Sequence, residues 1–300
     1  MKNWNQLFIR QGWNVKELKE NVFSLQEETS DNKDFLLESL NKVETSYTLQ
    51  GEVLTVNCTP VSEESWLQAV DFKGRGYGEG LWFRPGLEQP KVKELDTYIS
   101  VIVRQLNRLG FYTSGSCDGH EKRSAHVMLK RDTTNIEHLV EMLLALGMKR
   151  VHYRESKNHF HVNLPLSRKE LLELAENMSV IEKEWLDKGT KYIKKQLFNL
   201  TLEQLLSIPG ESGKEDRVRE YVKSKITPFV DYITVDRHGN LLAKKTYRTG
   251  NGPTILLNAH LDTVESIHPE RKIIKNGDIW TSSRGILGAD DRAGVAVILH

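Results

Sequence analysis

Cysteine is nearly absent from this chain. Its 300 residues include only Cys58 and Cys117, which lie far apart in the sequence. Two isolated cysteines supply no disulfide framework, and such usage is typical of proteins kept in a reducing compartment. We therefore expect two free thiols and a cytoplasmic protein.

An excess of either charge is also missing, since 42 Lys and Arg balance 41 Asp and Glu. A balanced chain has no overall field to recruit nucleic acid or an anionic membrane surface. The sequence after Met1 runs directly into polar and charged residues without a long apolar stretch. We therefore expect no signal peptide, no membrane span and no nucleic-acid partner.

The hydrophobic pattern up to residue 196 predicts an α+β domain. Apolar residues recur at helical spacing over residues 91–109 and 136–146. An alternating stretch over 125–129 and runs around Val151 and His161 predict strands. The first ninety residues show no legible pattern. A charged amphipathic stretch over 167–198 precedes a change of character, so we expect the domain boundary between residues 196 and 197.

Beyond that boundary the pattern predicts an α/β domain. Ser212 and Glu215 have capping-box spacing before a helical pattern, and residues 232–235 and 241–244 predict a hairpin. Residues 254–259 are almost entirely apolar without alternation, which is typical of a strand covered on both faces. His260 directly follows this predicted strand.

His260-Leu261-Asp262 is a candidate metal-binding triplet. In an extended segment residues two apart point the same way, so Asp262 is placed to orient the His260 imidazole. An oriented, neutral imidazole is a zinc ligand. Taken alone, such a triplet is more often a surface histidine beside an aspartate.

The second candidate is the run from Gly285 to Gly294, which ends in Gly288-Ala289-Asp290-Asp291-Arg292-Ala293-Gly294. Its small residues allow close backbone approach, and Asp290 is expected to face the strand ends. One carboxylate can bridge two metal ions, as in two-metal hydrolases. The simpler alternative is an acidic helix N-terminus, where Asp is favoured by capping and by the helix dipole.

Four segments in order resemble the two-zinc exopeptidase family that contains peptidase T, carboxypeptidase G and the diaminopimelate desuccinylases. Peptidase T is the most similar branch, and the resemblance covers about residues 197–300. The segments are the loop 207–215, the strand region 236–241 with Gly-Asn-Leu, the segment 260–264 and the run that begins at Gly288.

The resemblance implies a site and a reaction. His260 would ligate one zinc, Asp262 would orient His260 as a catalytic residue, and Asp290 would bridge two zinc ions. It also implies a cis peptide bond between Asp290 and Asp291, a short peptide as substrate and a homodimer of the complete enzyme. Water activated by zinc would attack the peptide carbonyl.

The family's adjacent Glu-Glu pair and late histidine have no counterpart here. Glu27-Glu28 and Glu63-Glu64 precede the metal segments, and we interpret both pairs as solvated surface. Each zinc usually needs about three protein ligands. We therefore expect an amino-terminal fragment that hydrolyses nothing by itself. The alternative is a ligand- or partner-binding protein built on a degenerate peptidase scaffold.

Two features of the first domain remain open. Cys117 and His120, with His126, His159 and His161, are a possible metal or thiol site, although a turn with incidental histidines is the simpler interpretation. The glycine-, arginine- and aromatic-containing residues 72–84 are interpreted as a surface loop rather than a nucleic-acid or phosphate-binding segment.

Overall fold

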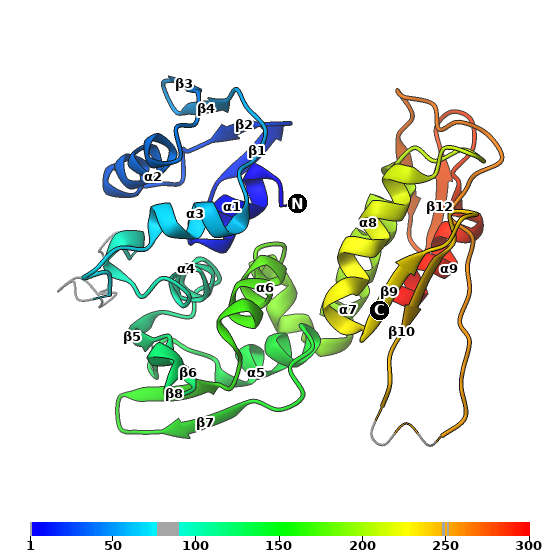
Figure 1. Cartoon of the computed structure of the whole chain (residues 1–300). Coiled ribbons are helices and arrows are strands. Elements are labelled where there is room, and N and C mark those ends of the chain that lie inside the picture. The colour runs from blue at the N-terminus through cyan, green and yellow to red at the C-terminus, as the bar shows by residue number, and fades with distance from the viewer. Residues whose placement is uncertain (1, 77–89, 248–249, 251) are drawn as a thin grey trace. The chain divides into compact units, whose positions relative to one another are not determined.

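The structure is a computed structural model that describes residues 2–76, 90–247, 250 and 252–300. The chain forms two compact units, Met1–Ile193 and Lys194–His300 (Figure 1). Both helices and sheets occur, which is compatible with the expected mixed fold class. No helix among the described residues is both long and apolar enough to cross a membrane.

The first part of unit Met1–Ile193 is a small sheet with helices and an aromatic core. The strands pair antiparallel in the order β1-β2-β4-β3. Trp66 packs its ring against those of Trp4, Phe8 and Trp13, with centroids 5.6–5.8 Å apart. The elements are α1 (Trp4–Arg10), β1 (Lys16–Lys19), β2 (Val22–Ser24), α2 (Ser30–Lys42), β3 (Tyr47–Gln50), β4 (Val53–Val56) and α3 (Glu63–Val70).

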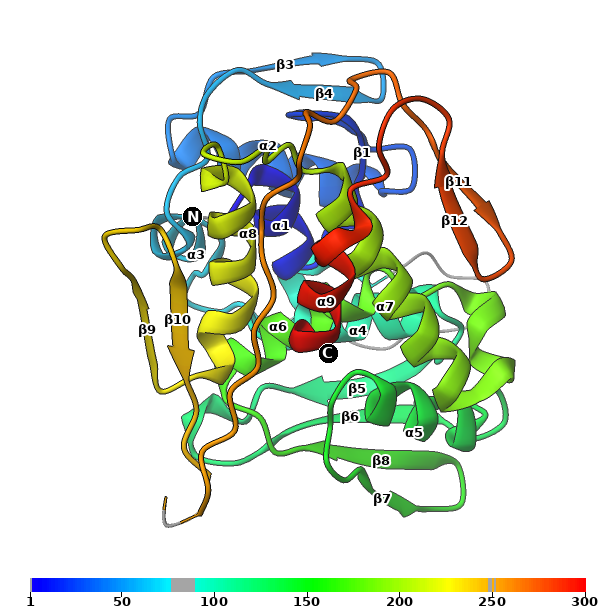
Figure 2. The same ribbon diagram turned by 90° about the vertical axis from the view of Figure 1, so that its right-hand side faces the viewer.

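The second part of this unit contains a four-stranded antiparallel sheet, ordered β5-β6-β8-β7 (Figure 2). Residues in β6 and β8 alternate between buried and half-buried, because one sheet face packs on the core. The elements are η1 (Val92–Glu94), α4 (Ser100–Arg108), β5 (Thr113–Cys117), η2 (Gly119–Glu121), β6 (Ala125–Lys130), α5 (Ile136–Ala145), β7 (His152–Glu155), β8 (His159–Leu164), α6 (Arg168–Met178) and η3 (Lys183–Lys188).

Most predictions for this part are confirmed, but the helix expected over residues 91–109 is shorter. It begins only at Ser100, after the 3-10 turn η1 and an extended Leu95. The apolar residues before Ser100 are buried all the same. A turn can bury apolar residues as a helix does, so periodicity alone did not mark the helix start.

The interpretation of both acidic pairs as solvated surface is wrong for one member of each. Glu28 is buried and contacts Arg104 of α4 at 2.7 Å, and both side chains are fully buried. Glu63 is half-buried and accepts a hydrogen bond from the buried Arg10. The compensating arginines are distant in sequence, so no local pattern indicated this burial.

The segment 72–84 is only partly described, since residues 77–89 lie outside the described ranges. Arg75, at its start, is not a surface-loop residue but is buried. Its guanidinium donates hydrogen bonds to the carbonyl oxygens of Val70, Val92 and Leu95 and to the Ser100 hydroxyl. Burial lowers the pKa of Arg75 to about 10, although nearby aspartates oppose this. Arg75 therefore joins backbone segments within the core.

Glu176 makes the unit sensitive to acid. Burial raises the pKa of Glu176, but the combined effect of Lys2, Gln6 and Arg10 is in the opposite direction and larger. The pKa of Glu176 in the folded protein therefore lies below the ordinary 4.5. A depressed carboxyl pKa contributes stability that is complete above the ordinary pKa and is lost as the pH falls through the folded value.

We expect Glu176→Gln to weaken the loss of stability below about pH 4.5, measured by denaturant unfolding across pH. Glu173→Gln on the same helix is the control, and identical acid profiles would contradict the prediction.

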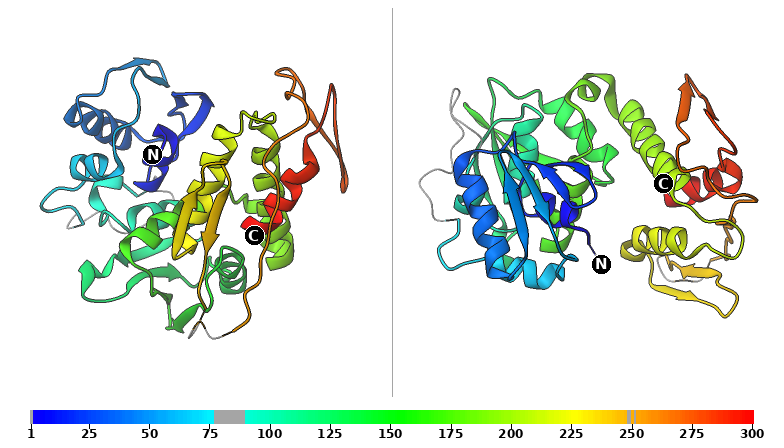
Figure 3. Two further views of the ribbon diagram at one scale, coloured as in Figure 1. Left: turned by 45° about the vertical axis from the view of Figure 1, so that its right-hand side comes forward. Right: turned by 90° about the horizontal axis from the view of Figure 1, so that it is seen from above.

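Helix α7 (Gly189–Ser207) runs through the expected boundary and belongs to both units. The other elements of unit Lys194–His300 are α8 (Asp216–Ile226), η4 (Thr227–Phe229), β9 (Tyr232–Val235), β10 (Leu241–Lys244), β11 (Ile273–Asn276), β12 (Ile279–Ser282) and α9 (Ala289–Leu299). The predicted hairpin is confirmed as β9 and β10, which lie beside α8 (Figure 3). Leu205, Val218, Val222, Val295 and Ala296 form a small buried core between helices.

Two expectations for this unit are wrong. Residues 254–259 form no strand, and Ile255 and Leu256 are 80% and 84% exposed. In the described part of the chain no strand pairs with this segment, although Ala259 at its end packs against the small core of the unit. The capping box is also absent, because Glu215 is the N-cap of α8 and makes no side-chain capping bond. Ser212 instead donates its hydroxyl hydrogen to Asp262.

Candidate metal centre

The structure brings the three predicted site residues together. His260 and Asp262 lie on the extended chain after residue 259, and Asp290 lies in the first turn of α9. The Nδ1 atom of His260 is 3.0 Å from Asp262 Oδ1, and its Nε2 atom is 3.3 Å from Asp290 Oδ1. One imidazole therefore joins two carboxylates that are 28 positions apart in the sequence.

Asp262 is held by the loop that precedes α8. Glu211 and Thr263 form a parallel bridge, Thr263 N–H donates to Gly210 O at 2.9 Å, and Ser212 N–H donates to Thr263 O at 3.1 Å. The Ser212 hydroxyl donates to the second oxygen of Asp262. Sequence reasoning assigned Ser212 to a helix cap and missed this role. The loop 207–215 could have indicated this role, because it is one of the four segments that carry the family resemblance.

Hydrogen bonding determines the charge states at the triplet. The Ser212 hydroxyl lowers the pKa of Asp262, and weaker contributions from the backbone and from His260 act in the same direction against the opposing effect of burial. An ionised carboxylate only accepts hydrogen bonds, so Nδ1 of His260 carries the hydrogen that faces Asp262. Burial lowers the pKa of His260, but the contacts with Asp290 and Asp262 outweigh it and raise that pKa. Nε2 is the nitrogen directed at Asp290.

The acidic helix start has two distinct carboxylates. Asp291 Oδ1 accepts a hydrogen bond from Gly294 N–H at 3.2 Å, so Asp291 satisfies a backbone amide near the start of α9. Asp290 has non-helical backbone angles and its side chain is 99% exposed beside His260. The peptide bond between them is cis, as the resemblance implied. The capping alternative therefore describes Asp291, whereas Asp290 is directed toward the histidine.

Arg292 fixes the start of α9 against the end of α7. It is fully buried, and its Nη1 atom donates to Leu205 O at 2.8 Å and Ile208 O at 3.3 Å. Gly210 allows this arrangement, because a Cβ there would lie 2.6 Å from Arg292 Nη2. The close approach keeps the loop, the helix start and the triplet in one local structure.

The candidate ligand atoms of His260 and Asp290 fit a zinc ion. Two atoms that share a tetrahedral zinc at about 2.0–2.1 Å lie roughly 3.3–3.4 Å apart, and His260 Nε2 and Asp290 Oδ1 are separated by 3.3 Å. Imidazole nitrogen and carboxylate oxygen are both ordinary zinc ligands, and Asp262 is the kind of carboxylate that orients a ligating histidine. Two ligands are fewer than the three that catalytic zinc sites usually have.

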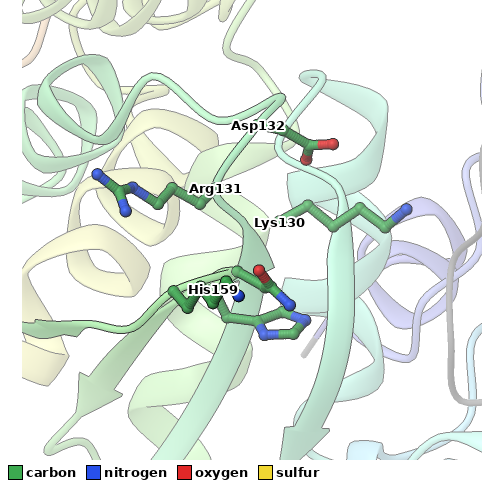
Figure 4. Close-up of a pocket in the computed structure, with 6 residues that line it drawn as sticks. Lys130, Arg131, Asp132 and His159 are labelled. Atoms are coloured by element: carbon green, nitrogen blue, oxygen red, sulfur yellow. The ribbon is translucent and has the colours of Figure 1, made fainter.

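The histidines and cysteine of unit Met1–Ile193 fall into separate groups. Cys117 and His120 lie together with Asp96 and Asp118. His126 and His161 stack on each other, with ring centroids 4.7 Å apart. His159 lines a different feature, a cavity of about 530 Å³ formed in part by Lys130, the last residue of β6, and by Arg131 and Asp132 after it (Figure 4). Cys117, His120, His126, His159 and His161 therefore do not form one site. This agrees with the simpler interpretation for the histidines of β6 and β8, which was that they are incidental.

That cavity carries mixed charges at the ends of β6 and β8. Lys130 and Arg131 extend away from each other in Figure 4. Arg131 pairs with Glu155 at 2.5 Å, and both side chains are about half exposed. Exposed ion pairs of this kind contribute little and do not converge on a common ligand position. The cavity therefore adds no ligand to the His260 and Asp290 pair or to the group around Cys117 and His120.

Comparison with known proteins finds short matches. The chain is 35% identical over 88 residues to a LysW-lysine/LysW-ornithine hydrolase of Pyrococcus furiosus, covering 29% of this chain and 25% of the relative. It is 38% identical over 71 residues to a protein named as an aminopeptidase of Acetivibrio thermocellus, covering 24% and 20%. It is 32% identical over 107 residues to the uncharacterized protein YqjE of Bacillus subtilis, covering 32% and 28%.

The matches span about a quarter of the length of these curated relatives. No protein-family model matches the chain, and no solved structure is significantly similar to it. Two of these three relatives are named as a hydrolase and an aminopeptidase. Over these short segments the chain is therefore similar to peptidase-like hydrolases.

Proposed function

We propose that unit Lys194–His300 is the metal-binding front part of a zinc-dependent exopeptidase that hydrolyses short peptides, of the peptidase T type. The observation that carries the proposal is the convergence of His260 Nε2 and Asp290 Oδ1 at 3.3 Å, with His260 Nδ1 held by Asp262. The similarity to hydrolases and an aminopeptidase supports the reaction class. Unit Met1–Ile193 would be an α+β accessory domain.

Each residue has a defined task in this proposal. Asp262 accepts the Nδ1 hydrogen of His260, which leaves Nε2 as the atom available to a cation. Ser212 keeps the Asp262 carboxylate in place. Asp290 supplies a second candidate metal ligand, its carboxylate oxygen, on the Nε2 side of the His260 ring. A zinc ion held by His260 and Asp290 would supply Lewis-acid polarisation of a peptide carbonyl and a nucleophile at neutral pH. A general base and the remaining ligands would come from elsewhere in the complete enzyme.

Binding of zinc to the 300-residue protein tests the first step. We expect zinc to shift the His260 Nε2 resonance in long-range nitrogen NMR spectra while Nδ1 stays protonated, because Asp262 retains that hydrogen. The binding should be weak, since only two protein ligands converge here. The experiment is made in a Cys117→Ser background, so that zinc held by a thiolate does not contribute.

Matched variants decide which residues are responsible. Asp290→Asn should abolish or strongly reduce the His260 shift. His238→Ala should leave it unchanged, because His238 lies in the exposed turn between β9 and β10 of the same unit. Unchanged His260 ring resonances at saturating zinc would refute the proposed site. Hydrolysis of di- and tripeptides by the complete enzyme, lost in His260→Ala, tests the reaction itself.

A further inference from the structure

We propose that Asp96, Cys117, Asp118 and His120 bind one divalent transition-metal ion of the zinc class, at a second site in unit Met1–Ile193. One ligand atom from each side chain lies within 4.8 Å of all the others. The four residues come from two segments, the turn before α4 and the end of β5. This inference does not depend on the proposed peptidase function.

The cluster lies where strand β5 ends. Cys117 is the last residue of β5, and Asp118 caps the following turn η2 by accepting the His120 N–H at 2.8 Å. Asp96 accepts the Asp118 N–H at 3.1 Å through Oδ2, and its own carbonyl accepts from the first turn of α4. The backbone therefore brings two distant segments together before any ion is bound.

Three backbone positions hold this arrangement. A Cβ at Gly76 would lie 1.8 Å from Asp96 Oδ1, so only glycine allows the chain to pass over that carboxylate. Gly119 has φ +81°, and a Cβ there would lie 3.1 Å from the Ser124 backbone. His120 itself has φ +47°, in the left-handed region that non-glycine residues rarely adopt. This uncommon conformation directs the imidazole back toward Asp96 and Asp118.

The separations suit a shared ion. His120 Nε2 is 3.8 Å from Asp96 Oδ2, and His120 Nδ1 is 3.6 Å from Asp118 Oδ1. Ligands on a tetrahedral zinc at about 2.0–2.3 Å are separated by roughly 3.3–3.8 Å. Both contacts are too long for direct hydrogen bonds, and each has the length of one edge of such a tetrahedron, so either ring nitrogen could share an ion with one carboxylate. Only one ring nitrogen of His120 can ligate at a time.

Local charge also favours a divalent cation. Among the described residues, the carboxylates of Asp71, Asp96 and Asp118 act on the buried Arg75. Arg168 is the second nearby cation, at 3.6 Å from Asp118 Oδ2. Three carboxylates and two guanidinium groups leave one negative charge. A dipositive ion with a Cys117 thiolate would bring this group to neutrality, with the thiol proton released to solvent.

The ligand chemistry selects the kind of ion. Thiolate and imidazole are preferred by zinc and its borderline neighbours, whereas calcium and magnesium prefer sites made of oxygen atoms. The side chains of Asp96 and Asp118 are nearly buried, at 11% and 4% exposure, while that of His120 is 58% exposed. The ion would enter from the His120 side. It would link the turn before α4 to the loop after β5.

Cobalt(II) titration of the 300-residue chain carrying His260→Ala and Asp290→Asn tests the site, because those changes remove the other proposed ligands. We expect one equivalent of Co²⁺ to give the near-ultraviolet thiolate charge-transfer band and the strong visible bands of a tetrahedral thiolate site. Zinc should displace the cobalt and raise the melting temperature. Cys117→Ser should remove the charge-transfer band, whereas Cys58→Ser should retain it.

His120→Asn is the second variant, because asparagine tolerates the left-handed conformation and preserves the fold. It should weaken cobalt binding roughly tenfold or more, while His126→Asn, across the ladder from Cys117, should bind as the parent chain does. Circular dichroism of each variant confirms folding. Absence of the band in the folded parent chain, or a band that survives Cys117→Ser, would overturn the proposal.

Discussion

Replacing Glu28 by glutamine is expected to lower the free energy of unfolding of the 300-residue protein by roughly 3–5 kcal/mol. Glutamine keeps the size of the side chain but removes its charge. Arg104 would then remain as a buried cation without its carboxylate partner, which is the costly way to break an internal ion pair. Two-state unfolding in urea, followed by tryptophan fluorescence, measures the change.

The structural basis is a fully desolvated network. Both Glu28 oxygens accept from Arg104 Nη2 at 2.7 Å, and the same carboxylate accepts from Asn14 N–H and the Asn32 side-chain amide. Arg104 also donates to Gly12 O at 3.0 Å. Burial lowers the pKa of Arg104, and the Glu28 charge counteracts this effect. The network joins the first helices to α4, so its loss affects the whole core of the unit.

Glu27→Gln is the matched control, because Glu27 is the exposed neighbour in the same acidic pair. It should change the unfolding free energy by about 0.5 kcal/mol or less. Equal, small effects of both substitutions would show that Arg104 finds another partner or water, and would contradict the importance of this ion pair.

Asp262→Asn is expected to weaken metal binding at His260 by about 10–100-fold. Asparagine retains the shape of the side chain but no longer provides an ionised oxygen for the Nδ1 hydrogen of His260. It can present its amide N–H₂ instead, which favours the tautomer that carries hydrogen on Nε2. That tautomer blocks the atom 3.3 Å from Asp290.

Competition with a chromophoric zinc chelator in the Cys117→Ser background measures the affinity. Asp278→Asn is the control, because Asp278 pairs with Lys195 on the same unit and is not part of the site. Unchanged affinity in Asp262→Asn, with the His260 tautomer also unchanged, would show that Asp262 does not orient the imidazole.

Local patterns predicted the elements that local forces specify. The β9–β10 hairpin has the predicted bounds because alternation and a turn that begins at Asp236 act over a few residues. The same holds for β6 and α5, whose periodicity matches one buried face. The candidate triplet and Asp290 were also recognisable, because their residue types and spacing already suggest a ligand and its orienting carboxylate.

The pairing of polar and charged side chains with partners from distant segments could not be predicted from local patterns. Glu28 and Arg75 have the composition of surface residues, yet each is buried by partners supplied from distant segments. Ser212 fits a capping pattern but bonds to Asp262, 50 positions later. Residues 254–259 look like a buried strand but remain exposed, because burial of a strand requires neighbouring strands that its own sequence does not encode.

The sequence by itself determined the kinds of chemistry available to this protein: imidazole and carboxylate near residue 260, carboxylates at 290 and 291, and a thiol at 117. Tertiary structure decided which of these groups meet. Asp290 faces His260 while Asp291 accepts a hydrogen bond from the helix backbone, and Cys117 lies in one cluster with Asp96, Asp118 and His120. The reason is physical, since ligand chemistry belongs to single side chains, whereas convergence within a few ångströms depends on how distant backbone segments pack.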